Sequence, residues 1–459
     1  MCLLDGQTYF PYVACEPSIV HVQSDNPGSY GMKLNKCIRC GQCMSVCPVY
    51  QTTFHETDVA RGKLALLEAV ERGALKSSAR LKEILSRCLL CGACADICAS
   101  QVQTTRLIQQ GRHSIFESVS VAPPGRLLIK SIRAGNLPGK AVLKGGALLQ
   151  ALLCRKIPET SGLHLRFPLS FFTDRATIPG VAWTPFTKAF HREEKKGNEK
   201  LRIGFFVGCG ANYLFTEAAW ALVHILRLAG HTVIVPEDQV CCGLPAYVAG
   251  DTETARDLAR KNIEVFDSQK LDVIVTVCAS CGSHLMKLGT LFEDDPAFHD
   301  RADRLAARHM DAMAFLVEKL QFDEHLKNYY SSAERSAPPP VRVVYHDPCH
   351  LRIGQGVTEP PRKLLEATPG VKLLEAPHPG RCCGHGGDFN LTHFDLSMKI
   401  LERRMMDFQA VGPNAIVTGC TGCLLQFTEG VSRHGLEEKI KVCHPLVLLE
   451  SAIAADSSP

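Results

Sequence analysis

Short apolar runs alternate with helical patterns along the C-terminal half of the chain. We expect strands at 201–208, 231–236, 271–277, 341–346, 371–376 and 414–419. We expect helices at 212–229, 251–267 and 393–409, where apolar residues recur with helical periodicity. Strands that alternate with helices predict α/β units built on parallel sheets. The order of elements occurs twice, so we expect two such domains, at 201–330 and 341–455.

The N-terminal part of the chain has a different pattern. Residues 1–33 contain three prolines and no sustained period, and we expect an N-terminal extension there. Residues 58–75 place Leu64 and Leu67 on one helical stripe, and Gly73 can end the helix. This part of the chain is therefore expected to be helical.

Residues 113–200 have a looser pattern, with recurrent prolines and a closing run of charges. The stretch 111–200 holds 15 Lys plus Arg against 6 Asp plus Glu, whereas the whole chain has a net charge of only +4. We expect a basic, solvated linker with short helices. The alternative is a docking surface for an acidic partner subunit or an anionic membrane face, which would allow peripheral membrane association.

The composition is that of a globular protein, with 46% hydrophobic and 21% charged residues. Neither a membrane-spanning stretch nor a secretory signal is apparent, so we expect a cytoplasmic location or one at the cytoplasmic face of the membrane. In that reducing compartment, 22 cysteines favour metal ligation over disulfides. The small net charge and 7% aromatic content give no indication of a nucleic-acid partner.

Eight cysteines form two runs within a predicted domain at 34–112. The first run is Cys37, Cys40, Cys43 and Cys47, and the second is Cys88, Cys91, Cys94 and Cys98. Both have the spacing C-x2-C-x2-C-x3-C, and in two-cluster ferredoxins the fourth cysteine ligates the other cluster. We therefore expect two [4Fe–4S] clusters, one on Cys37, Cys40, Cys43 and Cys98 and one on Cys88, Cys91, Cys94 and Cys47.

The alternative for these runs is a pair of structural zinc sites. Zinc sites use four ligands in two pairs rather than two runs of four, so the spacing favours iron–sulfur clusters. One departure from the usual ferredoxin pattern is Cys98-Ala99, where proline commonly follows the cysteine. Because that proline shapes the turn and is not a ligand, we expect the site to tolerate alanine.

Ten further cysteines form an internal repeat. The first copy contains Cys209, Cys241, Cys242, Cys278 and Cys281, and the second contains Cys349, Cys382, Cys383, Cys420 and Cys423, at offsets of 140 to 142 residues. Cys209, Cys278 and Cys420 lie at or just beyond the C-terminal ends of expected strands, where open α/β sheets bind ligands, and Cys349 lies a few residues past its strand. Gly243 and Gly384 follow the adjacent cysteine pairs, and glycine there can adopt a positive φ and let the backbone approach a cluster.

The pattern Cys-x31/32-Cys-Cys-Gly-x34/35-Cys-x2-Cys resembles the cysteine-rich CCG domain. That domain is paired in heterodisulfide reductase catalytic subunits and in the iron–sulfur subunits of glycolate and lactate oxidases. The resemblance extends from about residue 34 to 455, with a helical ferredoxin module similar to that of respiratory iron–sulfur subunits. It implies an α+β multidomain fold, and one or two further [4Fe–4S] clusters of noncubane type on the five-cysteine sets.

The domain order looks most like that of the glycolate oxidase iron–sulfur subunit. This resemblance implies an electron-transfer subunit without catalytic residues of its own, working with an FAD-containing dehydrogenase subunit and passing electrons to a quinone, a cytochrome or another carrier. Both CCG motifs are complete, as in heterodisulfide reductase, so the alternative is a subunit that reduces a disulfide. No G-x-G-x-x-G follows an expected strand, so we expect no FAD or NAD on this chain itself.

Three histidines adjoin the motif cysteines: His350, His385 and His444. We expect them to donate hydrogen bonds around the clusters rather than to ligate iron, with His385 as the residue to test first. Four cysteines lie outside the motifs and are expected to be inert thiols: Cys2, Cys15, Cys154 and Cys443.

Overall fold

The computed structural model describes residues 36–118, 154–156, 162–165, 174–191, 201–331 and 340–456. The predicted N-terminal extension, most of the predicted linker, Cys2 and Cys15 lie outside these residues. Lys33–Pro459 belong to one unit, in which the N-terminal module and the two repeats are packed together. The boundaries between the domains stay predictions.

Short helices make up the N-terminal module. They are α1 (Gln42–Val46), α2 (Tyr50–Thr53), the 3-10 turn η2 (Glu56–Asp58), α3 (Ala60–Glu71), α4 (Ala79–Ser86), α5 (Ala93–Asp96) and α6 (Thr104–Ser118). The helix expected at 58–75 is present as α3, which buries Leu64 and Leu67 as its apolar stripe predicts. Gly73 follows the helix with a φ of 71°, a value that glycine adopts without steric cost. Helix α3 also buries Lys63, which its apolar pattern did not predict.

The first repeat is built on a parallel sheet with strand order β5-β4-β6-β7. Its strands are β4 (Arg202–Phe205), β5 (Thr232–Ile234), β6 (Val273–Thr276) and β7 (His309–Asp311). The principal helices are α11 (Thr216–Leu228), α13 (Thr252–Asp267), α15 (Pro296–Arg308) and α16 (Ala312–Glu318). All four residues of β6 are buried, as expected for a central strand covered by helices on both faces.

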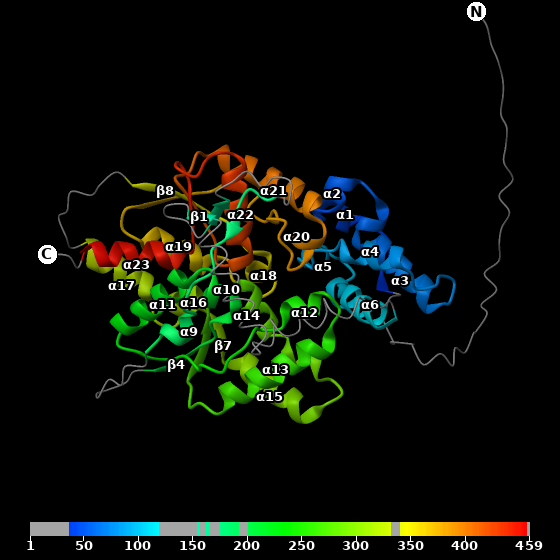
Figure 1. Cartoon of the computed structure of the whole chain (residues 1–459), viewed down its shortest axis with the longest axis horizontal. Coiled ribbons are helices and arrows are strands. Elements are labelled where there is room, and N and C mark those ends of the chain that lie inside the picture. The colour runs from blue at the N-terminus through cyan, green and yellow to red at the C-terminus, as the bar shows by residue number, and fades with distance from the viewer. Residues whose placement is uncertain are drawn as a thin grey trace, which may run out of the picture. The chain divides into compact units, whose positions relative to one another are not determined.

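The second repeat has the same topology, with strand order β11-β10-β8-β9. Its strands are β8 (Val341–Tyr345), β9 (Val371–Leu374), β10 (Ala415–Val417) and β11 (Lys441–Cys443). Helices α19 (Glu359–Ala367), α21 (Phe394–Gln409), α22 (Thr421–Arg433) and α23 (Pro445–Asp456) accompany this sheet. The predicted fold class and the internal repeat are thus confirmed (Figure 1).

The fourth strand of each sheet was not predicted. Strands β7 and β11 have three residues each and pair in parallel with the end of a neighbouring strand. A run of three residues is too short to show a strand period, and His309 and Lys441 interrupt the apolar pattern there. Pairing with a preformed sheet edge therefore decides their conformation.

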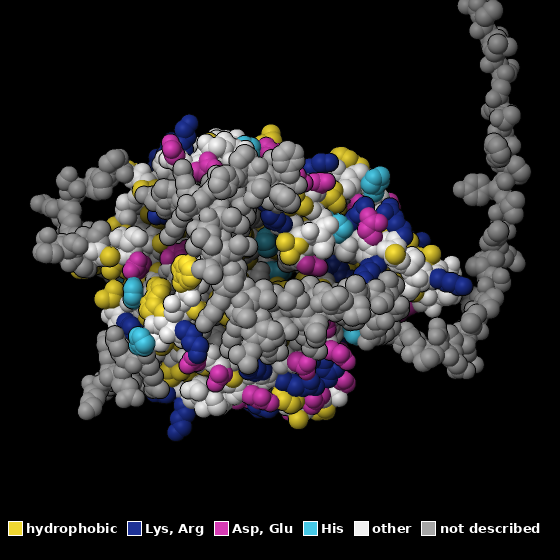
Figure 2. Space-filling model, viewed as in Figure 1, with side chains coloured by type: hydrophobic (Ala, Val, Ile, Leu, Met, Phe, Trp, Pro, Cys, Tyr) yellow, Lys and Arg dark blue, Asp and Glu magenta, His cyan; other side chains and the backbone are white. Residues whose placement is uncertain are grey.

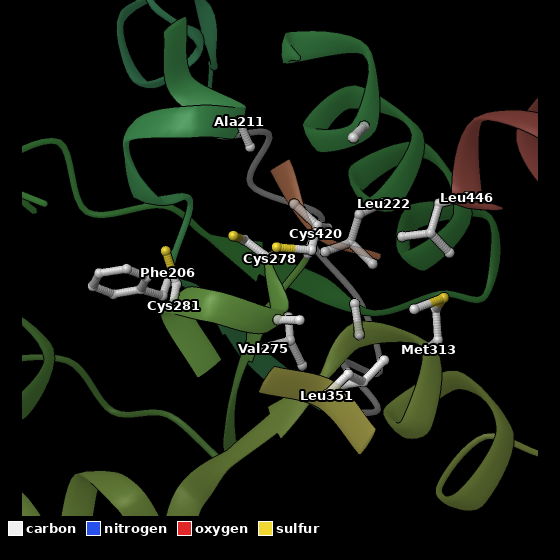
Figure 3. Packing of buried hydrophobic residues seen from close by; sticks show 14 of the residues in the cluster. Phe206, Ala211, Leu222, Val275, Cys278, Cys281, Met313, Leu351, Cys420 and Leu446 are labelled. Atoms are coloured by element: carbon white, nitrogen blue, oxygen red, sulfur yellow. The ribbon is translucent and has the colours of Figure 1, made fainter. Parts of the chain in front are cut away.

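One apolar core extends through both repeats. It includes Leu222 on α11, Met313 on α16 and Leu446 on α23, all of which are buried. Figure 3 shows Leu222 and Leu446 side by side, so the last helix of the second repeat closes the core of the first. The two repeats therefore form a single packed body and are not separate domains joined only by a linker.

The N-terminal module docks on both repeats. Arg112 on α6 is buried and donates hydrogen bonds to the backbone oxygens of Leu85 in the module and Val248 in the first repeat. On the other side, Ser86 Oγ lies 2.8 Å from His393 Nε2, which belongs to the second repeat. Figure 1 shows the module beside α12 (Leu244–Val248) and α20 (Phe389–Thr392).

Charged side chains on the helices of the first repeat are paired. Arg256 lies 2.8 Å from Asp294, and Arg301 lies 2.9 Å from Asp267. Figure 2 shows cationic and anionic side chains interleaved over α13 and α15. Exposed pairs of this kind add little to stability, so the apolar core carries most of it. Among the residues that the structure describes, no helix has the length and apolar character needed to cross a membrane.

Residues 174–191, within the predicted linker, belong to the packed body. Phe186 on α9 (Phe186–Ala189) is completely buried, with its ring centroid 4.8 Å from that of Trp220. The backbone N–H groups of Ala176 and Thr177 donate to the carboxylate of Glu429 on α22. This part of the segment therefore ties the two repeats together.

Replacing Phe186 by alanine should destabilise the first repeat by about 3–5 kcal/mol, because a large buried ring leaves a cavity. The matched control is Trp183→Ala in the same segment, whose side chain is exposed and whose loss should cost less than about 0.5 kcal/mol. Denaturant titration followed by far-UV circular dichroism would measure both. Equal stabilities for the two variants would show that 174–191 is not part of the core.

Candidate iron–sulfur sites

The two cysteine runs of the N-terminal module have the same backbone conformation. In each loop the residue two positions after the first cysteine has a positive φ, 56° at Arg39 and 51° at Leu90. The glycines that follow, Gly41 and Gly92, have φ values of 87° and 83° and precede helices α1 and α5. These left-handed residues curl each loop, so that three thiols at intervals of three residues turn toward one side.

Two voids lie between the loops, and cysteines line both. The first void is lined by Cys37, Cys40, Cys43, Cys94 and Cys98. The second void is lined by Cys47, Cys88, Cys91 and Cys94. The fourth cysteine of each run thus faces the void of the other run, and Cys94 stands between the two.

In each repeat the five cysteines gather at the carboxyl edge of the sheet. Cys209 lies in the first turn of α10 (Gly208–Tyr213), directly after β4. Cys278 is the N-terminal cap residue of α14 (Ala279–Leu285), and Cys420 occupies the same place on α22. A helix N-terminus carries a partial positive charge, which stabilises a thiolate.

The glycine after each cysteine pair has the conformation that the sequence predicted. Gly243 has a φ of 94° and Gly384 a φ of 91°. A Cβ atom on Gly384 would lie 2.8 Å from the backbone oxygen of Ser397, so no other residue fits there without a shift of the backbone. The turn brings the cysteine pair back toward the Cys-x2-Cys helix.

The five cysteines of the first repeat lie in contact with one another. A hydrogen bond with Cys241 raises the pKa of Cys209 well above its usual value. A hydrogen bond with Cys242 does the same to the pKa of Cys281, which also bonds Cys278. The structure therefore brings all five predicted thiols of this repeat to one place.

The second set is equally close. Cys383 Sγ lies 3.3 Å from Cys423 Sγ. A hydrogen bond with Cys382 raises the pKa of Cys349, and bonds with Cys349 and Cys383 lower the pKa of Cys382. Cys423 in turn bonds Cys383 and Cys420.

The two five-cysteine sets meet across the boundary between the repeats. Cys278 Sγ lies 3.2 Å from Thr421 Oγ1, and Cys420 Sγ lies 3.2 Å from Ser280 Oγ. The backbone N–H of Ala279 donates to the backbone oxygen of Gly419 at 2.8 Å. Figure 3 shows the side chains of Cys278 and Cys420 side by side. Each Cys-x2-Cys helix thus offers a hydroxyl group to the cysteine that caps the other.

The second repeat also borders the N-terminal module at its cysteines. Cys91 and Cys382 pack against the same buried cluster, which contains Leu89 and Phe389. Burial, followed by the charge of Cys382, raises the pKa of Cys91. Each cysteine set therefore adjoins the next in this order: first void, second void, second repeat, first repeat.

Two of the histidines near the cysteines, His350 and His444, form hydrogen bonds across the boundary between the repeats. His350 Nδ1 lies 2.9 Å from Ser280 Oγ, and His444 Nε2 lies 3.0 Å from the backbone oxygen of Val277. His385 packs against Gly422, and burial lowers its pKa to about 4, so the ring is neutral at pH 7. Its Nδ1 has no hydrogen-bond partner among the described residues.

Two residues near the site were missed in the sequence. A ring nitrogen of His346 and the sulfurs of Cys383 and Cys423 all lie within 4.8 Å of one another. His284 on α14 lies near Cys241, whose charge opposes the effect of burial on the pKa of His284. His346 belongs to the segment HDPCHL, so its position three residues before Cys349 was the available signal.

Cys443 lies apart from the cysteine sets. It is buried on β11 within an apolar cluster that includes Val343 and Leu365, and burial raises its pKa to about 12. A protonated, enclosed thiol of this kind is inert. The side chain of Cys154 lies outside the described residues.

The residues present fit iron–sulfur clusters by their chemistry. Each of the two voids is bordered by at least four sulfur donors, and neither is lined by a histidine. Asp58 is the one carboxylate at either void, and it lies 3.8 Å from Lys63. Donor sets dominated by cysteine sulfur suit iron–sulfur clusters and disfavour hard cations such as Mg²⁺ and Ca²⁺.

Comparisons with known proteins give the same division of the chain. Residues 33–102 match the family described as 4Fe-4S dicluster domain, and residues 203–286 and 343–428 each match the cysteine-rich CCG domain.

Several curated proteins are similar over most of the chain or over a large part of it. The probable glycolate oxidase iron–sulfur subunit of Bacillus subtilis is 32% identical, covering 92% of this chain and 94% of its own. A subunit of the fumarate reductase (CoM/CoB) of Methanothermobacter marburgensis is 28% identical, covering 92% and 73%. Lactate utilization protein A of Geobacillus thermodenitrificans is 29% identical, covering 53% and 96%.

The two kinds of cysteine motif, their spacing and this similarity along the chain agree. The chain belongs to the family of iron–sulfur proteins that join a 4Fe-4S dicluster domain to two CCG domains, the family of the glycolate oxidase iron–sulfur subunits.

Proposed function

We propose that this chain is the electron-transferring iron–sulfur subunit of a flavin-dependent oxidase of 2-hydroxy acids such as glycolate or lactate. The observation that carries the proposal is the line of four cysteine sets described above. The relatives named for glycolate oxidase and lactate utilization supply the substrate class. An FAD-containing partner would oxidise the hydroxy acid, and a quinone or another carrier would accept the electrons.

We assign the ligands from the cysteines that border each void. Cys37, Cys40, Cys43 and Cys98 would hold the first cubane cluster, and Cys47, Cys88, Cys91 and Cys94 the second. The five-cysteine sets of the two CCG domains would hold the further, noncubane clusters. Such clusters accept and release single electrons at potentials that their surroundings set.

The protein's own groups influence the protonation of these thiols and bring the cysteine sets together. Hydrogen bonds with Cys281 and Cys420 lower the pKa of Cys278 and favour its thiolate, whereas the hydrogen bond with Cys278 raises the pKa of Cys420 to about 11. Cys91 and Cys382 pack against the same apolar cluster, which brings two cysteine sets near each other. A cytoplasmic location fits this chemistry, because a reducing compartment keeps cysteines from forming disulfides.

A second candidate function is the reduction of a disulfide at the paired CCG domains. Both motifs are complete, their sets touch through Cys278 and Cys420, and Cys209 is exposed. Reduction of a disulfide consumes two electrons and two protons and yields two thiols. The similarity to the fumarate reductase (CoM/CoB) relative favours keeping this candidate.

Co-expression with a flavoprotein partner, followed by anaerobic purification and assay, tests the proposed function. Glycolate or lactate should reduce the complex and bleach its iron–sulfur absorbance, whereas the isolated chain should not respond to either acid. The proposal is wrong if no flavoprotein accompanies the chain and the preparation reduces a heterodisulfide while oxidising no hydroxy acid.

The ligand assignment makes a separate prediction. Cys98→Ser should disturb the first cluster and Cys47→Ser the second, each with the loss of up to about four irons per chain. Cys47→Ser should leave the first cluster in place but cut it off from the CCG domains, because the second void is the one that lies near Cys382. Cys443→Ala is the control, since it should retain the full iron content. Iron analysis and electron paramagnetic resonance would measure these effects, and an exchange of the two phenotypes would refute crossed ligation.

A further inference from the structure

A buried lysine lies in the wall of the second void. Lys63 is completely buried, and its side chain lines this void together with Cys47 and Cys88. Its Nζ donates to the backbone oxygen of Thr57 at 3.0 Å, and lies 3.8 Å from Asp58 Oδ1. A buried cation is costly, so its presence beside the thiols requires a negative partner.

The position of Lys63 depends on the glycine before it. A Cβ atom on Gly62 would lie 2.0 Å from the backbone oxygen of Glu56. Only glycine lets α3 begin this close to η2, and the close approach turns Lys63 inward over the cysteines. The sequence Arg61-Gly62-Lys63 thus places one basic side chain outside and one inside.

Several charges surround the second void. Arg112 is buried and donates to the backbone oxygen of Cys88, while Arg87 lies 3.6 Å from Asp58. Burial lowers the pKa of Lys63, and the charges of Cys88, Asp58 and Cys47 oppose that effect. Arg87 is also paired with Glu83 at 2.5 Å. The buried cations beside this void are therefore Lys63 and Arg112, and Asp58 is the one carboxylate in its lining.

The first void has no buried cation among its lining residues. Arg39 is largely exposed and lies 3.4 Å from Glu68, and Arg61 is paired with Glu56. Arg61 is half-buried but lies 2.5 Å from Glu56, which offsets much of its charge, whereas Lys63 is completely buried and lies 3.8 Å from its carboxylate. A buried cation also acts through a medium of lower dielectric constant than a partly solvated one. The two voids therefore differ in electrostatic potential.

We propose that Lys63 raises the reduction potential of the second cluster above that of the first. Reduction adds one electron, and hence one negative charge, to the cluster, and the fixed charge of Lys63 stabilises the reduced form. The electron comes from the first cluster, which is oxidised, and no proton or bond is exchanged. Electrons would thus collect beside the second CCG domain. This inference rests on the proposed function and gives its relay a direction.

A redox titration of the anaerobically purified full-length chain, followed by electron paramagnetic resonance, tests the proposal. Lys63→Met removes the charge and keeps the length of the side chain. It should lower the equilibrium constant for reduction of the second cluster about tenfold or more, and a tenfold change is about 59 mV for one electron. Lys63→Arg should retain the potential. In the control, Arg72→Gln, which removes an exposed cation at the end of α3, the equilibrium constant of either cluster should change less than about threefold.

A second variant keeps the test decisive if Lys63→Met fails to assemble its clusters, since that variant removes one of the two cations beside Asp58. In Asp58→Asn the removal of the carboxylate should shift the potential of the second cluster in the opposite direction. Full iron content with unchanged potentials in both variants overturns the role of Lys63 and leaves the proposed function intact. Zinc without iron in the wild-type chain would instead refute the clusters themselves.

Discussion

The contact between the two Cys-x2-Cys helices organises the C-terminal body of this protein. Helices α14 and α22 approach each other with their N-termini, so that Thr421 reaches Cys278 and Ser280 reaches Cys420. Two positive helix ends would repel each other in an apolar interior. Cysteine caps, with their capacity to carry negative charge, relieve that repulsion. The apolar core shared by the two repeats surrounds this meeting point and includes Cys278 and Cys420.

In the N-terminal module, too, backbone conformation and packing decide where the thiols lie. Residues with a positive φ turn the thiols of each loop inward. Arg112 bonds the first repeat and Ser86 bonds the second, so the module is held against both. Cys91 then comes to lie against Cys382. Packing between domains, rather than a tether, thus decides which cysteine sets are neighbours. An electron carrier needs such fixed spacing, because a moving domain would change every transfer distance.

Much of this architecture could be predicted from the sequence. Fixed cysteine spacing reports local loop geometry, and an offset shared by five cysteines reports a repeated fold. The order of the four sets could not be predicted, because it depends on surfaces such as Leu89 and Phe389 that meet only after folding. The burial of Lys63 was missed for a related reason: a lysine within an amphipathic helix normally marks the solvent side. The extended conformation of strands β7 and β11 results from pairing with β6 and β10 and not from the pattern of their own residues.

Cys98 of the second run lines the first void, and Cys47 of the first run lines the second void. This crossing has a consequence for the synthesis and folding of the chain. A chain leaving the ribosome presents three thiols of the first void by residue 43, but the fourth only at residue 98. The second void likewise needs Cys47 from the earlier loop and three cysteines from the later one. With the proposed ligands, neither iron–sulfur centre could mature on half of the module. Insertion of the metal and closure of the module would then be one event.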